Sequence, residues 1–126
     1  MSVQKRPLSG MVQPSGVALP VAIPQGPARA VLHTLGSVGT QQGGPFVDRI
    51  SVWVSNSDVA NDHLAALAFF NPTSILAEVL VPKGSTVEVL VDVPFASARD
   101  AVPATLEASA DAAGVLTAWG WFARPL

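Results

Sequence analysis

Cysteine and tyrosine are absent from this sequence, and histidine occurs only twice in its 126 residues. Without cysteine there are no disulfide bonds and no thiolate metal ligands, so packing or assembly must stabilise the fold. With so few Cys, Tyr and His side chains, little remains that commonly serves as a nucleophile or proton carrier. Charged residues are also scarce, at 13% of the chain, about half the usual share. A surface with so little charge indicates that part of it is covered.

The first third of the chain is basic, and the remainder is acidic on balance. Lys5, Arg6 and Arg29 are the only charged residues before Asp48, and all nine acidic residues lie from Asp48 onward. Three positive charges over that length are too few for nucleic-acid binding, which usually needs a dense basic cluster or stripe. They form either a solvated basic tail or a means of docking on an acidic neighbour.

Long apolar runs are absent as well. No stretch reaches the roughly 18 consecutive apolar residues of a transmembrane helix. No secretory signal is evident, because Pro7, Pro14, Pro20 and Pro24 interrupt the segment that follows the first basic residues. We therefore expect neither a membrane nor a nucleic acid as a partner.

The chain divides into an N-terminal segment, residues 1–27, and one domain, residues 28–126. The first segment holds five of the eleven prolines, which excludes a helix, yet it is too apolar for a flexible linker. We expect an extended arm that lies on a neighbouring molecule or along its own domain, with an edge strand of that domain as the alternative. The apolar residues of the arm are Met11, Val12, Val17, Leu19, Val21 and Ile23.

The clearest local pattern is Ser74–Val93, SILAEVLVPKGSTVEVLVDV, which predicts two strands folded against each other through a Pro-Lys-Gly turn. Pro82 presets φ at the first corner of the turn, and Gly84 supplies the positive φ of a type II turn. Alternation within both strands predicts one buried and one exposed face. The expected core face comprises Ile75, Ala77, Val79, Val81, Val87, Val89, Val91 and Val93. The expected outer face comprises Leu76, Leu80 and Leu90 with Glu78, Glu88 and Asp92.

Six further segments have the alternation or length of strands. Among them, Ile50, Val52 and Val54 are expected to face the core. Trp53 is expected on the polar side, where it is either covered by the arm or an interface anchor. Eight short strands predict an all-β fold, an antiparallel β-sandwich of jelly-roll type, with an immunoglobulin-like arrangement as the alternative. The six segments are residues 17–23, 28–34, 46–55, 64–70, 104–111 and 115–123.

Two loops have the composition of ligand-binding motifs and lack their defining residues. The glycine-rich loop Gly36–Pro45 has no Gly-Lys-Ser/Thr ending, and a strand rather than a helix follows it, so we expect no nucleotide site. The loop Asn56–His63 does not have the spacing of a calcium loop, and a turn stabilised by Asx side chains explains it. His33 and His63 lack partners for zinc and are expected to be structural or surface residues. We expect no metal and no cofactor.

The last strand carries Trp119 and Trp121 on one face, across Gly120, whose missing side chain leaves room for a close neighbour. We expect these rings in the core rather than on a carbohydrate platform, with Arg124 stacked on one of them. For catalysis, no Gly-x-Ser-x-Gly elbow is present, neither histidine has an evident orienting carboxylate, and the acidic residues lie at solvent-side positions of regular strands. We expect no catalytic residue and no enzyme activity.

Three features together resemble the small β-sandwich proteins of tailed-phage virions, the decoration or cement proteins of the head. They are the basic arm rich in proline and glycine, the segment VPKGSTVEVLVDVP and the closing segment LEASADAAGVLTAWGWF. The resemblance implies a non-enzymatic protein of the capsid surface that binds the major capsid protein over joints between its subunits and stabilises the bacteriophage head. It also implies contacts between copies of the protein, as a dimer or a trimer, and an arm that reaches across a neighbour.

Two other functions stay open. One is a carbohydrate- or receptor-binding β-sandwich that uses Trp53, Trp119 or Trp121, and the other is a tail or connector component of the same particle. The partner-binding candidates are Lys5, Arg6, Met11, Val12, Val17, Leu19, Val21, Ile23, Arg29 and Trp53.

Overall fold

The structure is a computed structural model that describes residues 5–36, 47–70, 73–96 and 104–124. Its elements are β1 (Lys5–Pro7), the 3-10 helix η1 (Ser9–Met11), β2 (Val21–Ala22), β3 (Ala30–Gly36), β4 (Val47–Asn56), β5 (His63–Phe70), β6 (Thr73–Val81), β7 (Thr86–Ala96), β8 (Ala104–Ala110) and β9 (Leu116–Ala123). The positions 37–46 and 97–103, and with them most of the glycine-rich loop and of the connection before β8, lie outside the described residues. None of the helices in the described ranges is long and apolar enough to cross a membrane.

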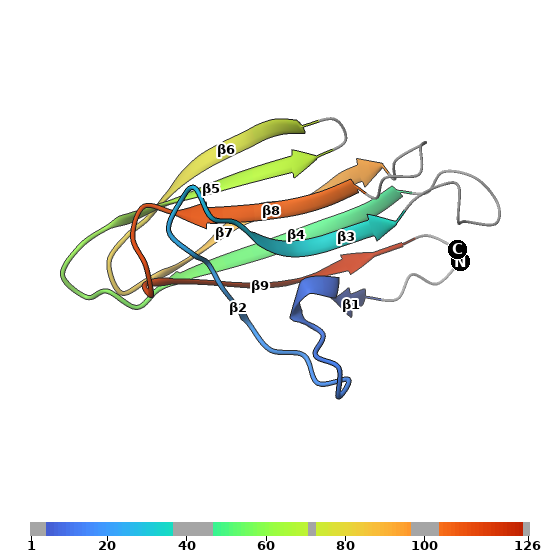
Figure 1. Ribbon diagram of the computed structural model, residues 1–126, viewed down its shortest axis with the longest axis horizontal. Coiled ribbons are helices and arrows are strands. Elements are labelled where there is room, and N and C mark those ends of the chain that lie inside the picture. Colours follow the sequence, from blue (N-terminus) through green and yellow to red (C-terminus); the bar gives the residue numbers. More distant parts are fainter. Residues whose placement is uncertain (1–4, 37–46, 71–72, 97–103, 125–126) are drawn as a thin grey trace.

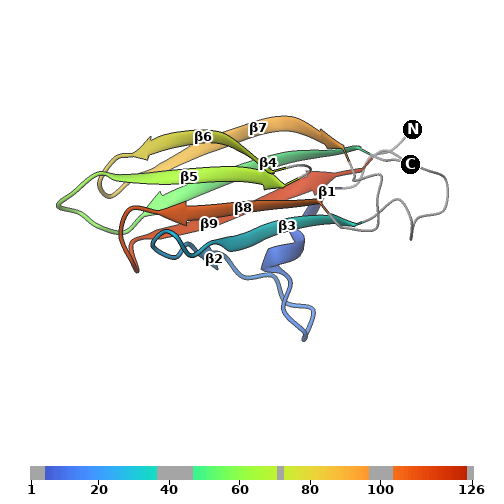
Figure 2. The same ribbon diagram turned by 45° about the horizontal axis from the view of Figure 1, so that its top comes forward.

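Two antiparallel sheets pack face to face, which confirms the predicted β-sandwich (Figure 1, Figure 2). The first sheet has the strand order β1-β9-β4-β7, with β2 also paired to β9, and the second has the order β3-β8-β5-β6. The core lies between the sheets because one face of each strand carries the apolar residues. Every second residue of β8 and β9 is buried. Ile50, Val52 and Val54 of β4 are fully buried, as predicted.

The segment Ser74–Val93 forms two strands, but the predicted hairpin is wrong. β6 pairs with β5 in the second sheet, and β7 pairs with β4 in the first, so the turn between them carries the chain from one sheet to the other. The Ser85 N–H donates to the Pro82 carbonyl at 3.1 Å, which makes Pro82 the first residue of the turn rather than its first corner. Gly84 has φ of +64°, as predicted. Local alternation predicts strands, but it does not determine which strand each one pairs with.

Strand β7 departs from its predicted faces at its centre. Leu90 is buried against the core, whereas Val91 is 63% exposed, the reverse of the prediction. The cause is two register shifts against β4, one on each side of Leu90. Asp92 has a positive φ of 50°, and its N–H donates to Ser51 Oγ at 2.9 Å, which holds the bulged backbone in place. Alternation predicts faces only where a strand has no bulge.

The arm lies along its own domain, and the predicted alternative of an edge strand is confirmed. β1 and β2 both pair with β9, although β2 covers only the end of the predicted segment 17–23. The Leu8 N–H donates to Gly120 O at 3.3 Å, and the Ile23 N–H to Leu116 O at 3.0 Å. The Ala110 N–H, at the end of β8, donates to Pro24 O at 2.8 Å. The arm therefore bonds to both sheets and closes one flank of the sandwich.

Candidate functional site

Between its two strands, the arm forms a projecting turn of residues 11–19, which we call the arm finger. Val12 and Ala18 form an antiparallel bridge, and the Leu19 N–H donates to Met11 O at 2.9 Å. The finger extends away from the sandwich below β9 and β1 in Figure 1. The exposed fractions are 46% for Val12, 55% for Val17 and 50% for Leu19. The finger thus presents three apolar side chains to solvent on a hydrogen-bonded backbone.

The structure places the predicted partner-binding residues in three environments. Met11 and Ile23 are buried in the core of their own domain, so the prediction that they face a partner is wrong. Both turn inward because the arm folds back on β9. Leu8, which no pattern in the sequence marked, is fully buried beside them. Val21 and Trp53 are half-buried, and the exposed candidates are Lys5, Arg6, Val12, Val17, Leu19 and Arg29.

Three tryptophans form a row on the outer face of the first sheet. The rings of Trp53 and Trp119 stack at 4.7 Å between centroids with 8° between their planes, and Trp121 packs tilted against Trp53 at 4.6 Å. Lys5 Nζ lies 4.7 Å from the Trp121 ring. Trp119 and Trp121 do not lie inside the core as expected, because the buried positions of β9 are Leu116, Ala118, Gly120 and Phe122 and the two tryptophans alternate with them. Trp119 is half-buried and packs against the margin of the core. Trp53 packs against both of the other rings.

Gly120 leaves room for a close neighbour, as predicted. A Cβ at this position would overlap the carbonyl oxygen of Ser51 on the adjacent strand. Arg124 Cζ lies 5.5 Å from the centroid of the Phe122 ring. Its guanidinium donates to both carboxylate oxygens of Asp48, at 2.6 and 2.9 Å.

Asp48 also binds His33 from the opposite sheet, and together they form a buried polar cluster. His33 Nε2 lies 2.8 Å from Asp48 Oδ2, and both side chains are almost completely buried. Burial acts to raise the pKa of Asp48, but the hydrogen bonds from Arg124 and His33 outweigh it and hold the pKa below its usual value. The cluster joins β3, β4 and the end of β9 across the core.

Ser9, His33 and Asp48 are the three residue types of a serine-hydrolase triad, but they are arranged differently from a triad. The Ser9 backbone N–H, not the hydroxyl, binds His33 Nδ1, at 3.0 Å. The Ser9 hydroxyl accepts a hydrogen bond from the Thr34 N–H at 2.7 Å. A nucleophile needs its hydroxyl on the imidazole base. This cluster therefore fastens η1 to β3 and β4 and does not activate a serine.

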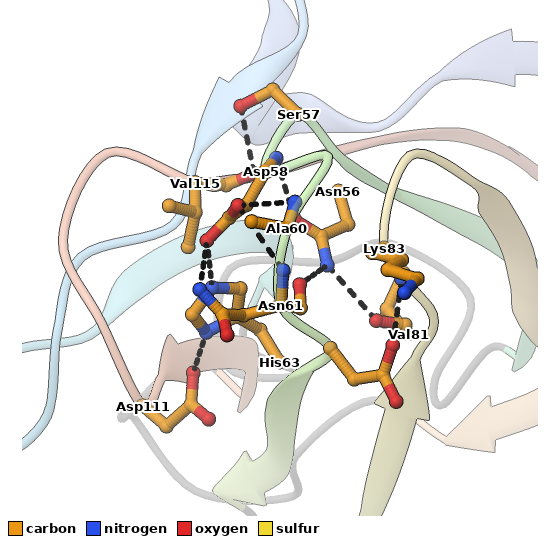
Figure 3. Close-up of polar contacts among 11 residues, drawn as sticks. Asn56, Ser57, Asp58, Ala60, Asn61, His63, Val81, Lys83, Asp111 and Val115 are labelled. Carbon is orange, nitrogen blue, oxygen red and sulfur yellow. Dashed lines mark hydrogen bonds and ion pairs between the residues drawn. The ribbon is translucent and has the colours of Figure 1, made fainter.

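The loop between β4 and β5 is held by Asx side chains, as predicted (Figure 3). Asp58 Oδ1 accepts hydrogen bonds from the backbone N–H groups of Ala60 and Asn61, at 2.8 and 3.2 Å. The Asn56 amide donates to Val81 O at 3.0 Å and so connects this loop to the end of β6. Such local side-chain bonds to backbone are typical of Asx turns.

His63 lies at the end of this loop between two carboxylates. Its Nε2 is 2.9 Å from Asp58 Oδ2 and its Nδ1 is 2.8 Å from Asp111 Oδ1. The bonds to Asp58 and then Asp111 raise the pKa of His63 above its usual 6.5. The bond from His63, followed by that from the Ala60 N–H, lowers the pKa of Asp58 to about 2. The two carboxylates lie on opposite ring nitrogens, so they do not converge on one point where an ion would bind.

In the described part of the chain, the loops around His63 hold no cluster suited to a metal ion, and a depression that Asp111 helps to line borders them. Within the described ranges, no group of three or more His, Cys, Asp or Glu residues has an arrangement that could hold a metal ion. A shallow depression of about 170 Å³ lies on the second sheet, below the 300–1,000 Å³ usual for small-molecule sites. Its lining residues are Leu64, Ala66, Glu78, Ser109, Ala110 and Asp111.

Comparison with models of protein families, with curated proteins and with solved structures finds no match. The function must therefore be argued from the geometry of the chain itself. Both histidines have orienting carboxylates, contrary to the expectation from the sequence. Asp58 lies five residues before His63, a local signal that could have been used. Asp48 reaches His33 only because their strands face each other across the sandwich, and no spacing in the sequence indicates that.

Proposed function

We propose that this protein is a structural component of a tailed-phage virion, located at the capsid surface, where it binds over joints between major capsid subunits and stabilises the head. The observation that carries the proposal is that apolar side chains are exposed on two opposite flanks of the sandwich. A protein that fastens neighbours to each other needs at least two separate contact surfaces. The sequence resemblance to decoration proteins supports the same function.

The first surface is the arm finger. Val12, Val17 and Leu19 project from the flank that the arm closes, and about half of each side chain is exposed to solvent. Lys5 and Arg6 are exposed on β1, on the same flank. Apolar anchors with a charged rim are typical of protein interfaces. This surface suits a protein partner with an apolar groove and acidic neighbours, which we assign to the major capsid protein.

The second surface is the opposite flank, where β6 and β7 are the last strands of their sheets (Figure 2). Leu80 on β6 and Val91 on β7 are 53% and 63% exposed. In β7, the bulges and Pro94 protect the strand edge against further pairing. β6 has a single charge, Glu78, and no proline, and no other strand of the described part pairs with its outer edge. We assign this edge to contacts between copies of the protein.

The hydrogen bonds of the described polar side chains hold the fold together, as expected for a protein with a structural function. The buried His33–Asp48–Arg124 cluster and the Asx loop use their hydrogen bonds to join parts of the fold. No buried side-chain nitrogen or oxygen of the described residues lacks a hydrogen-bond partner. Attachment to a shell depends on buried area and on the avidity of many copies rather than on reactive groups.

The test is co-sedimentation with empty capsids assembled from the major capsid protein encoded in the same genome. Deleting residues 1–27 would remove core residues, so substitutions on the finger are the sharper probe. We expect the double variant Val17→Lys, Leu19→Lys to bind at least about tenfold more weakly, or about 1.4 kcal/mol. The matched control is Val59→Lys, because Val59 is 80% exposed in the loop between β4 and β5. Wild-type protein that does not sediment with these capsids would refute the proposal.

A second candidate, carbohydrate or receptor binding, is favoured by the outward position of the tryptophan row. Against it, Trp53 and Trp119 cover each other's faces, and Lys5 covers part of Trp121. The test is a titration with oligosaccharides followed by tryptophan fluorescence. A saturable shift that Trp119→Ala abolishes would favour this function over capsid binding.

A further inference from the structure

Three of the described connections that cross between the sheets meet at one end of the sandwich, on the left in Figure 1. They join β4 to β5, β6 to β7, and β8 to β9. Backbone bonds already link them in pairs. The Ser57 N–H donates to Val115 O, and the Gly84 N–H to Asp58 O, each at 2.9 Å. At this end of the sandwich, hydrogen bonds therefore link the three connections to one another.

The His63 side chain also joins two of these connections, beside the Ser57 hydroxyl, which donates to Val115 O at 3.2 Å (Figure 3). Asp58 belongs to the β4–β5 loop and Asp111 to the β8–β9 loop, and each faces a different ring nitrogen of His63 at 2.8–2.9 Å. A carboxylate can only accept, so each contact needs an N–H on the ring. A neutral imidazole has one N–H, and its other nitrogen would place a lone pair against a carboxylate. Both bonds therefore require the imidazolium form.

His33 provides the opposite case within the same chain. Its Nδ1 accepts from the Ser9 backbone N–H at 3.0 Å, so this nitrogen carries no proton. Its Nε2 then donates to Asp48. The hydrogen-bond pattern assigns a neutral ring to His33 and a doubly protonated ring to His63.

We propose that His63 is a proton-dependent clasp: its protonated ring bonds to both the β4–β5 loop and the β8–β9 loop, and when the proton is lost it keeps its bond to only one of them, so that the backbone bond between the loops is left with less support. The clasp is a property of the folded chain that goes beyond the proposed virion function and does not depend on it.

The charges around the clasp favour the protonated ring. Besides Asp58 and Asp111, Asp62 lies in the same loop, where it accepts from the Lys83 backbone N–H at 2.9 Å. Beside β5, Glu78 of β6 and Asp111 of the β8–β9 loop line one depression. Lys83, on the β6–β7 turn, is the one basic residue among these groups. Four carboxylates against one ammonium stabilise a positive imidazole. The raised pKa of His63 agrees with this balance.

The pH range of the clasp follows from the two shifts. The pKa of His63 is raised in the folded state, so its stabilising effect is complete below the ordinary 6.5 and is lost as pH rises through the folded pKa. The pKa of Asp58 is lowered to about 2, so its effect is complete above the ordinary 3.8 and is lost as pH falls toward 2. The clasp is therefore fully closed in mild acid, and it opens as pH rises through the folded pKa of His63, which lies above 6.5.

NMR of the full chain tests the proposal, because only two imidazole rings contribute signals. Long-range ¹H–¹⁵N spectra distinguish protonated from unprotonated ring nitrogens. At pH about 6.5, we expect His63 to show two protonated nitrogens and His33 one, and His63 to titrate above its ordinary value. A singly protonated His63 at this pH, or a midpoint at or below 6.5, would overturn the clasp.

A second measurement tests the consequence for the loops. The side chain introduced by His63→Gln does not titrate, and its single NH₂ group can reach at most one of the two carboxylates. We expect the difference in melting temperature between wild type and His63→Gln to be large at pH about 6 and small at pH about 9. Asp111→Asn should reduce the same pH dependence while Asp58 still holds the ring. A difference that stays constant between these two pH values contradicts a proton-dependent clasp.

Discussion

Replacement of Leu8 by alanine tests whether the arm is part of the core. Leu8 is fully buried, and its backbone N–H bonds to Gly120 of β9. The substitution removes three carbon groups, worth about 2.4 kcal/mol at about 0.8 kcal/mol each. The cavity left behind adds to this loss, because the two sheets and η1 hold its walls in place, which brings the expected cost to about 3–4 kcal/mol. For a chain of this length, the melting temperature should fall by about 10–15 °C.

Denaturation in urea followed by tryptophan fluorescence measures this cost. The chain has three tryptophans and no tyrosine, so the emission reports on the row that β4 and β9 carry. We expect a lower midpoint with an unchanged slope, which indicates a loss of stability rather than a change of mechanism. Leu19→Ala is the matched control, because Leu19 is half-exposed in the same arm and its truncation should cost less than about 0.5 kcal/mol. If the two variants unfold at the same denaturant concentration, the arm does not contribute to the core and the description of this flank is wrong.

Two further substitutions test the inner face of the first sheet. Gly120→Ala should destabilise the fold by about 3 kcal/mol or more, because the new Cβ overlaps Ser51 O and β4 and β9 must separate; a melting temperature equal to that of wild type would contradict the close approach. Asp48→Asn should cost about 3 kcal/mol by leaving the Arg124 charge without its carboxylate. The pKa of Asp48 is lowered in the folded state, so wild type should lose this contribution as pH falls below the ordinary 3.8, and its stability should approach that of Asp48→Asn in acid. A gap that persists unchanged at pH about 2 would show that the charge of Asp48 is not responsible.

The strands and their inward faces could be predicted from the sequence because alternation is a local signal. Ile50, Val52 and Val54 are buried where their pattern places them, and β8 follows its alternation throughout. The pairing of β6 and β7 could not be predicted, because a turn with Pro82 and Gly84 serves equally well within one sheet and between two. The arm was ambiguous for a similar reason, since apolar residues between prolines suit any apolar surface, whether in their own domain or in a neighbour.

The candidate site was less predictable than the fold. Val12, Val17 and Leu19 are exposed because an antiparallel bridge between Val12 and Ala18 forms a projecting turn. No periodic pattern in the sequence predicts this bridge. The tryptophan row depends on the register of β4 against β9, which sets Trp53 opposite Trp119. The clasp needs Asp111, 48 residues from His63 in the sequence, and only the return of β8 beside β5 brings them together.

The paired bulges of β7 determine which insertions and deletions the strand tolerates. Across the first bulge, the residues that face the core change from odd-numbered to even-numbered positions, and across the second they change back. Val87 and Val93 therefore face the core from odd positions, and Leu90 between them from an even position. At each bulge one residue of β7 has no partner on β4, so deleting that residue alone would restore regular pairing and leave the other side chains on their present faces. A deletion elsewhere in the strand would shift the residues beyond it by one position and turn them to the other face of the sheet. Related chains should therefore differ in the length of this strand at the two bulges and not in the segments on either side.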